Sequence, residues 1–196
     1  MRTSFLKRAI AYKKCVQWRF LTFSLRFYLR MVGIEYGKNL TGNSCVIKNE
    51  GKIMIGDNVC LNSNPDGESY KTGLVTFLES SLIRIGNNCW LNGTMIYARS
   101  EVIIGDNCMF GHGVIILDNN SHNISIDQVK RRCNEITSRP IVLGNNVWVG
   151  RQSIILKNVN IGDNSIIAAG FVVTKNVPSN QLFGGNPASF IKNLTK

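Results

Sequence analysis

The chain contains two histidines, His112 and His122, which lie ten residues apart in an otherwise regular stretch of sequence. An imidazole can take up a proton near neutral pH, so either side chain could serve as a general base. Two histidines cannot form a three-histidine zinc site within one chain, and the six cysteines include no CxxC pair. We therefore expect general acid–base chemistry without a metal.

The sequence around both histidines repeats a short phrase typified by Ile-Gly-Asp-Asn. Its glycines fall at positions 56, 86, 105, 144 and 162, so the intervals are 30, 19, 39 and 18 residues. Eighteen is three sixes, and within each six one aliphatic residue is followed by Gly, Asn or Asp. Three short strands joined by tight corners would make one triangular coil, and stacked coils would bury a column of Ile and Val. The pattern predicts a mainly β solenoid.

Two of these intervals, 30 and 39 residues, exceed one coil by more than ten residues, which predicts loops that leave the solenoid. The longer interval places an excursion at about residues 119–139, and the other places a polar insert around 62–67. Loops on a rigid scaffold are common sites of function. His122 lies where the regular coil ends and the excursion begins, whereas His112 lies at a corner inside a coil.

The first 33 residues differ in composition from the rest of the chain. They hold eight basic residues and no acidic one, while residues 34–196 carry 15 basic and 12 acidic groups. We expect an N-terminal helical segment, 1–33, on which Arg19, Arg26 and Arg30 share one stripe. Residues 1–32 could pack on the protein or a sister subunit, or lie on an anionic membrane surface.

The charge and the hydropathy of the chain exclude two classes of protein. No run of 18 apolar residues occurs, so a membrane-spanning helix is not expected. The nearly balanced body does not fit a nucleic-acid-binding surface. Together with unpaired cysteines, these features predict a cytoplasmic protein, with peripheral contact at the inner membrane face as a further option.

The segment "NNVWVGRQSIILKNVNIGDNSIIAAGFVVTKNVPSNQLFGGNPASFIK" resembles the C-terminal signature of the hexapeptide-repeat acyltransferases, in their sugar O-acetyltransferase branch (maltose or galactoside acetyltransferases and surface polysaccharide acetyltransferases). The likeness extends over about residues 52–192. It implies a left-handed parallel β-helix with an N-terminal α-helical segment, a short C-terminal tail and assembly as a homotrimer. Spacing alone leaves a right-handed β-helix as the alternative.

The same resemblance implies roles for individual residues. His122 matches the general base that activates an acceptor hydroxyl for direct attack on acetyl-CoA, and Asp118 could orient it or be a corner residue. Asn92 matches an acceptor contact, and His112 is the competing base or a substrate contact. The coenzyme contacts correspond to Trp148, Gly150, Arg151, Ala168, Ala169, Gly170, Thr174, Lys175, Asn186, Pro187 and Lys192.

Two departures from the family pattern lie near the expected coenzyme groove. Lys157-Asn158 stands where the family usually has Pro-Gly, and Arg151 replaces a small residue. The resemblance predicts acetyl transfer to a sugar hydroxyl in capsule, exopolysaccharide or lipopolysaccharide synthesis. N-acetylation of an amino-sugar nucleotide, acetylation of serine or another small molecule, and a non-catalytic β-helix remain as alternatives.

Overall fold

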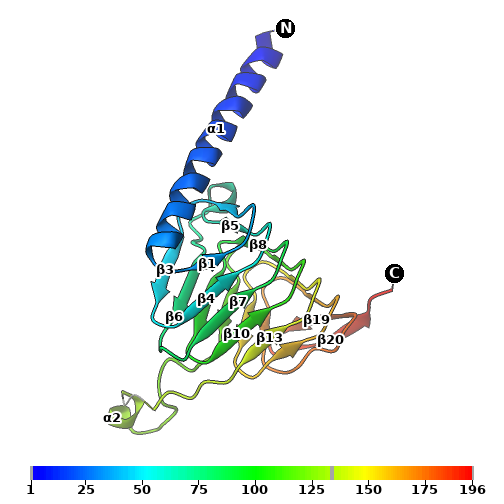
Figure 1. The fold of residues 1–196 in the computed structure, drawn as a ribbon. Coiled ribbons are helices and arrows are strands. Elements are labelled where there is room, and N and C mark those ends of the chain that lie inside the picture. Colours follow the sequence, from blue (N-terminus) through cyan, green and yellow to red (C-terminus); the bar gives the residue numbers. More distant parts are fainter. Residues whose placement is uncertain (1, 133–134, 196) are drawn as a thin grey trace.

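The computed structural model describes residues 2–132 and 135–195, so positions 1, 133–134 and 196 of the predicted segments lie outside this description. Within the described ranges the chain winds into a triangular prism whose sides are three sheets of stacked parallel strands (Figure 1). The helix α1 (Arg2–Met31) projects from one end, and a short C-terminal hairpin lies at the other.

Each side of the prism takes one strand from each successive coil. Sheet A consists of β1 (Glu35–Tyr36), β4 (Lys52–Ile55), β7 (Leu82–Ile85), β10 (Glu101–Ile104), β13 (Ile141–Leu143) and β16 (Asn160–Ile161). Sheet B consists of β2 (Thr41–Gly42), β5 (Cys60–Asn62), β8 (Trp90–Asn92), β11 (Met109–Phe110), β14 (Trp148–Val149), β17 (Ile166–Ile167), β19 (Gln181–Gly185) and β20 (Ala188–Asn193). Sheet C consists of β3 (Val46–Asn49), β6 (Gly73–Thr76), β9 (Met95–Ala98), β12 (Ile115–Leu117), β15 (Ile154–Leu156) and β18 (Val172–Val173).

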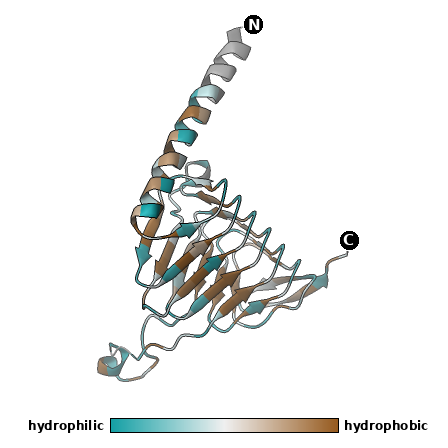
Figure 2. Ribbon diagram, viewed as in Figure 1, coloured by the Kyte–Doolittle hydropathy of each residue, from teal (hydrophilic) through white to brown (hydrophobic). Residues whose placement is uncertain are grey.

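The aliphatic residue of each six points into the prism. Ile83, Leu91 and Ile96 come from three successive sides and are fully buried, and the same positions in other coils continue the column. In Figure 2 the hydrophobic colour is prominent on the strands and the hydrophilic colour on many corners. Burial of this column supplies the main driving force for stacking the coils.

The Ile-Gly-Asp-Asn phrase forms the corner between sheets A and B. Its last asparagine has a left-handed backbone, with φ 55° at Asn88 and 59° at Asn107, a conformation that asparagine tolerates well. The Asn88 amide donates to the Asn107 side chain at 3.1 Å, and Asn58 donates to Asn88 at 2.9 Å. A Cβ on Gly86 would lie 2.7 Å from the carbonyl of Gly105, so the glycine permits the coils to approach.

Helix α1 covers the open end of the first coil with its C-terminal half. Leu25 and Leu29 are buried in the common core, and Thr22 Oγ1 donates to the carbonyl of Gly42 at 3.1 Å. The opposite face of α1 carries exposed apolar side chains at helical spacing. This apolar stripe comprises Tyr12, Val16, Phe20, Phe23, Phe27 and Met31.

The C-terminal segment has more structure than the expected tail. Strand β20 pairs antiparallel with β19, and this hairpin ends sheet B. The six-residue period does not predict it, because the period describes only strands that stack in parallel. Within the described residues, no helix is both long enough and apolar enough to cross a membrane.

Candidate active site

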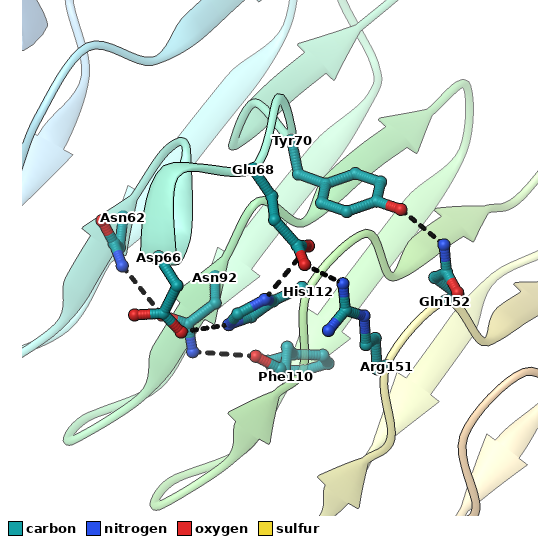
Figure 3. Close-up of polar contacts among 9 residues, drawn as sticks. All are labelled: Asn62, Asp66, Glu68, Tyr70, Asn92, Phe110, His112, Arg151 and Gln152. Carbon is teal, nitrogen blue, oxygen red and sulfur yellow. Dashed lines mark hydrogen bonds and ion pairs between the residues drawn. The ribbon is translucent and has the colours of Figure 1, made fainter.

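A cluster of polar side chains surrounds His112 at the corner after β11. The insert between β5 and β6 brings Asp66 and Glu68 to opposite edges of the imidazole (Figure 3). Asp66 Oδ2 lies 3.6 Å from His112 Nε2, and Glu68 Oε2 lies 3.4 Å from His112 Nδ1. The second pair lacks hydrogen-bond geometry, so these two buried atoms are in contact without a formed hydrogen bond. Both ring nitrogens therefore face carboxylates.

Residues of the next coil hold the insert in place. The Arg151 guanidinium donates to Glu68 Oε1, and the Gln152 amide donates to the hydroxyl of Tyr70. The Tyr70 ring lies where a Cβ on Gly113 would be, so the glycine at this corner leaves space for the ring. The two hydrogen bonds link residues more than eighty positions apart, and together with the Tyr70 packing they fix the insert on the prism.

Arg151 also sets the charge state of the insert. Its hydrogen bond and positive charge lower the pKa of the Glu68 carboxyl, and His112 acts in the same direction. In return, Glu68 raises the pKa of Arg151. The pair is partly exposed, so its value for stability is modest, but it favours an ionised Glu68 at neutral pH.

Two asparagines form the floor beside this cluster. Asn62 donates to the side-chain oxygen of Asn92 at 3.1 Å, and Asn92 donates to the carbonyl of Phe110 at 3.1 Å. Asn92 is one of the predicted acceptor contacts, and the structure places it beside His112, the other one (Figure 3).

His122 lies apart from this cluster, at the base of the excursion. An antiparallel bridge between Asn119 and Ser138 closes the excursion, and the amide of Arg139 donates to the carbonyl of Asp118 at 2.9 Å. The excursion carries the helix α2 (Gln128–Arg131) away from the prism (Figure 1). The His122 side chain is exposed, and it makes no hydrogen bond or ion pair with any residue that the structure describes.

The Asp118 carboxylate is fully buried and belongs to the excursion's base. Its two oxygens accept hydrogen bonds from the backbone amides of Arg99 at 2.8 Å and Ser100 at 2.6 Å. The Asn119 amide also donates to it, at 3.0 Å. The structure describes no contact between Asp118 and His122, so its observed partners fit the corner role better than the orienting role.

The outward face of sheet C, next to His122, is apolar. Strand pairing aligns its side chains in two rows across the coils. The rows are Met95, Ile115, Ile154, Val172 and Val75, Tyr97, Leu117, Leu156. The adjoining excursion also exposes Ile124, Ile126 and Val129. A contiguous apolar face of this kind marks an interaction surface.

The residues predicted to contact a coenzyme occupy the C-terminal coils. Ala169 and Gly170 form an exposed corner, and nothing lies within 4 Å of the place where a Gly170 Cβ would be. Lys175 is exposed beyond β18, and Trp148 presents a half-exposed indole on β14. The open corner and the nearby cation fit a thin phosphate-bearing arm. Arg151 instead pairs with Glu68 in this structure.

The remaining coenzyme candidates take the following positions. Gly150 is buried, and a Cβ there would lie 2.6 Å from the amide nitrogen of Ala169, so neighbouring coils approach closely at this glycine. The Asn186 side chain accepts a hydrogen bond from the amide of Val172 at 2.8 Å. Four further candidates are at least partly exposed at the C-terminal end of the prism: Ala168, Thr174, Pro187 and Lys192.

Sequence reasoning did not identify Asp66, Glu68 or Tyr70 as site residues. The insert is polar and interrupts the six-residue phrase, which is a signal that it carries function. The sequence does not show which residues of the neighbouring coils it contacts. Within the described part of the chain, no group of three or more His, Cys, Asp or Glu side chains is arranged to hold a metal ion.

The prism and its repeated corner phrase match family models of hexapeptide-repeat transferases. The family described as bacterial transferase hexapeptide (six repeats) matches residues 140–175, and the family described as hexapeptide repeat of succinyl-transferase matches residues 101–117. These matches and the superposition with solved relatives assign the prism to the left-handed parallel β-helix fold, and they make the chain similar to the hexapeptide-repeat acyltransferases.

Individual relatives agree with this assignment. Galactoside O-acetyltransferase of Escherichia coli K12 is 38% identical over 121 residues, which cover 61% of this chain and 58% of that protein. The Escherichia coli K12 protein named "Putative lipopolysaccharide biosynthesis O-acetyl transferase WbbJ" is 26% identical over 155 residues, which cover 76% of this chain and 75% of that protein. A galactoside acetyltransferase solved in complex with coenzyme A superposes with a TM-score of 0.57 at 28% identity, over 82% of this chain and 65% of that one. The chain thus spans less than two thirds of the length of these galactoside acetyltransferases.

Proposed function

We propose that the protein is an acetyl-CoA-dependent O-acetyltransferase that acts on a sugar hydroxyl. The likeness to galactoside O-acetyltransferase carries this proposal. The open corner at Ala169 and Gly170 and the exposed Lys175 support coenzyme binding by this chain. Acetyl-CoA supplies the acetyl group as a thioester. The alcohol oxygen forms a bond to the carbonyl carbon, the C–S bond breaks, and the coenzyme A thiolate is a good leaving group.

In this proposal His122 is the general base. A base needs a free ring nitrogen within reach of the hydroxyl proton. His122 has an exposed imidazole that makes no hydrogen bond or ion pair within the described chain, whereas both nitrogens of His112 face carboxylates. We therefore assign proton transfer to His122, and acceptor contacts to His112 and Asn92.

We propose that the active form is a homotrimer with a site at each subunit boundary. The apolar rows on sheet C, including Ile115 and Leu117, need a partner surface, and a second copy would cover them. His122 follows Leu117 by five residues, so a copy seated on this face would enclose the histidine. The exposed Ile124 and Ile126 of the excursion would be covered in the same contact.

We further propose that α1 lies on an anionic membrane at the cytoplasmic face. Its apolar stripe faces away from the prism, and the first 33 residues contain no acidic residue. Arg19 and Arg30 are exposed next to the stripe. An apolar face flanked by arginines is typical of helices that bind anionic lipid. This location suits an enzyme that modifies lipid-linked glycans.

The acceptor that we favour belongs to a surface polysaccharide. The likeness to WbbJ over three quarters of that protein supports it, because WbbJ is named for lipopolysaccharide synthesis. N-acetylation of an amino-sugar nucleotide is the alternative, and an acceptor with a free amine distinguishes the two.

The proposal is tested by release of free thiol from acetyl-CoA with a panel of acceptors: methyl β-galactoside, galacto-oligosaccharides, an amino-sugar nucleotide and serine. We expect turnover with sugars bearing hydroxyls, and a loss of at least about 100-fold in kcat for His122→Ala. The variant His122→Gln serves as a near-isosteric control for size, and coenzyme A binding by calorimetry shows that both variants remain folded. Sugar turnover that survives in His122→Ala would transfer the role of base to His112, and turnover with amines alone would contradict O-acetylation.

A further inference from the structure

A groove of about 450 Å³ lies between α1 and the insert that carries Asp66. Its volume is in the range of pockets that bind small molecules. It is separate from the coenzyme coils, which lie toward the other end of the prism. The lining residues are Lys14, Gln17, Trp18 and Leu21 from α1, Asn43, and Asn62, Ser63, Asn64 and Asp66 from β5 and the insert.

The groove has the chemistry of a carbohydrate site. Trp18 provides an aromatic face on which the C–H groups of a pyranose ring can stack, and its indole N–H is a donor. The amides of Asn62 and Asn64 offer both donors and acceptors, and Asp66 offers a carboxylate that can accept from two hydroxyls. An apolar platform with a few converging polar groups is how proteins bind and orient small polar ligands.

The insert wall of the groove is held firmly. The Asn43 amide donates to the carbonyl of Ser63 at 2.7 Å, and the backbone amide of Ser63 donates back to Asn43 at 2.6 Å. The Ser63 hydroxyl also accepts from the amide of Thr72 at 2.8 Å. A preorganised wall reduces the entropy that a ligand must overcome on binding.

The α1 wall offers side chains that are free to bind. Lys14, Gln17 and Trp18 make no hydrogen bond or ion pair with the described part of the chain, and neither does the side chain of Asn64. Their polar groups are therefore available to a ligand in the groove.

The groove and the His112 cluster share a wall. Asn62 lines the groove and donates to Asn92, and Asp66 lines the groove and lies 3.6 Å from His112. Figure 3 shows Asn62 and Asp66 at one side of the cluster, with Arg151 and Gln152 at the other. A ligand that contacts Asn92 and His112 can therefore extend over this shared wall toward Trp18.

We propose that the groove is a second sugar subsite, so that the acceptor is an oligosaccharide or longer glycan rather than a monosaccharide. The sugar ring next to the acetylated residue stacks on Trp18, and its hydroxyls bind Asp66 and the asparagine amides. This inference rests on the proposed sugar O-acetylation and names its substrate class. It also gives α1 a direct part in acceptor selection.

The test compares two probes, methyl β-galactoside and galactotetraose, with the full-length protein. Binding of each sugar is measured by calorimetry without acetyl-CoA, and kcat/KM is measured by thiol release. We expect the wild-type protein to prefer the tetrasaccharide by at least about tenfold in kcat/KM, and Trp18→Ala to lose most of this preference. Gln17→Ala, a milder change in the same wall, should lower the preference part of the way. Tyr28→Ala removes an exposed aromatic side chain of α1 outside the groove and should leave the preference unchanged.

The outcomes separate this inference from the proposed function. Tetrasaccharide binding that depends on Trp18 supports the subsite, even if neither sugar is acetylated. The absence of acetylation would then contradict only the proposed O-acetylation of these sugars. Acetylation with the same tetrasaccharide preference in wild type and Trp18→Ala overturns the subsite and leaves the function standing. Absence of tetrasaccharide binding to the wild-type protein also overturns it.

Discussion

Glu68 in the insert accepts a hydrogen bond from Arg151, which follows it by 83 residues, and this pair joins the insert to the coil beneath. The pair lowers the pKa of Glu68, so the ionised carboxylate is the form that binds. Its contribution is present above the unfolded-state pKa of Glu, about 4.3, and is lost as the pH falls through the lowered folded-state value.

We therefore expect Arg151→Gln to loosen the insert at neutral pH. The protection factors of the backbone amides of residues 63–72 against hydrogen exchange should fall in this variant. In the wild type they should fall only on acidification to about pH 4 or below, after correction for the slower intrinsic exchange at low pH. Arg84→Gln, which removes an exposed arginine on sheet A, is the control. An insert with equal protection in Arg151→Gln and wild type would show that other contacts hold it.

A charge on the apolar face of sheet C should break the proposed trimer. Leu117→Arg places a cation in the middle of the two apolar rows, where a partner subunit would bury it without a counter-charge. Light scattering with size-exclusion chromatography should give a trimer for the wild type and a monomer for the variant. Val142→Arg on sheet A should remain trimeric. A wild-type monomer at micromolar concentration would contradict the proposed assembly.

The apolar stripe of α1 predicts binding to anionic vesicles. The wild-type protein should sediment with phosphatidylglycerol vesicles at low salt, and less so as salt screens its arginines. The double variant Phe23→Ser, Phe27→Ser should lose most of this binding, because it removes the apolar side chains that enter the headgroup region. Val142→Ser, which removes an exposed apolar side chain from the prism, should bind like the wild type. Equal sedimentation of the double variant would refute the membrane contact.

Asp118 should contribute more to the stability of the fold than to proton transfer by His122. It is buried and accepts hydrogen bonds from two backbone amides, so Asp118→Ala should lower the free energy of unfolding by about 2 to 4 kcal/mol. Urea denaturation measures this change. The pH profile of kcat/KM should keep its midpoint, since no contact joins Asp118 to His122 within the described residues. A shifted midpoint at unchanged stability would instead support the orienting role.

The periodic part of the fold could be predicted because each coil repeats the same local rule. The buried aliphatic column and the Ile-Gly-Asp-Asn corners follow from residue types at spacing six, and Asn88 and Asn107 have the left-handed backbone that such corners require. The hairpin of β19 and β20 was not predicted, because it pairs antiparallel and leaves the period.

The candidate site was only partly predictable for a related reason. His112 and Asn92 belong to regular coils, so their proximity follows from stacking. Asp66 and Glu68 reach His112 through an aperiodic insert, and Trp18 reaches the same region from a helix. Their positions depend on tertiary contacts such as Arg151 with Glu68, which no local pattern encodes.

The two ends of the prism differ from its middle, and this difference has a consequence for evolution. Helix α1 closes the first coil with Leu25 and Leu29, and the β19–β20 hairpin ends the stack at the other side. Helix α1 thus shields the first coil, and the hairpin shields the edge of β17 in sheet B, where an open strand edge could otherwise template fibrils. A whole coil could be gained or lost between them without exposing a new edge. The length of such a solenoid can therefore change in steps of about eighteen residues, provided that both terminal structures are kept.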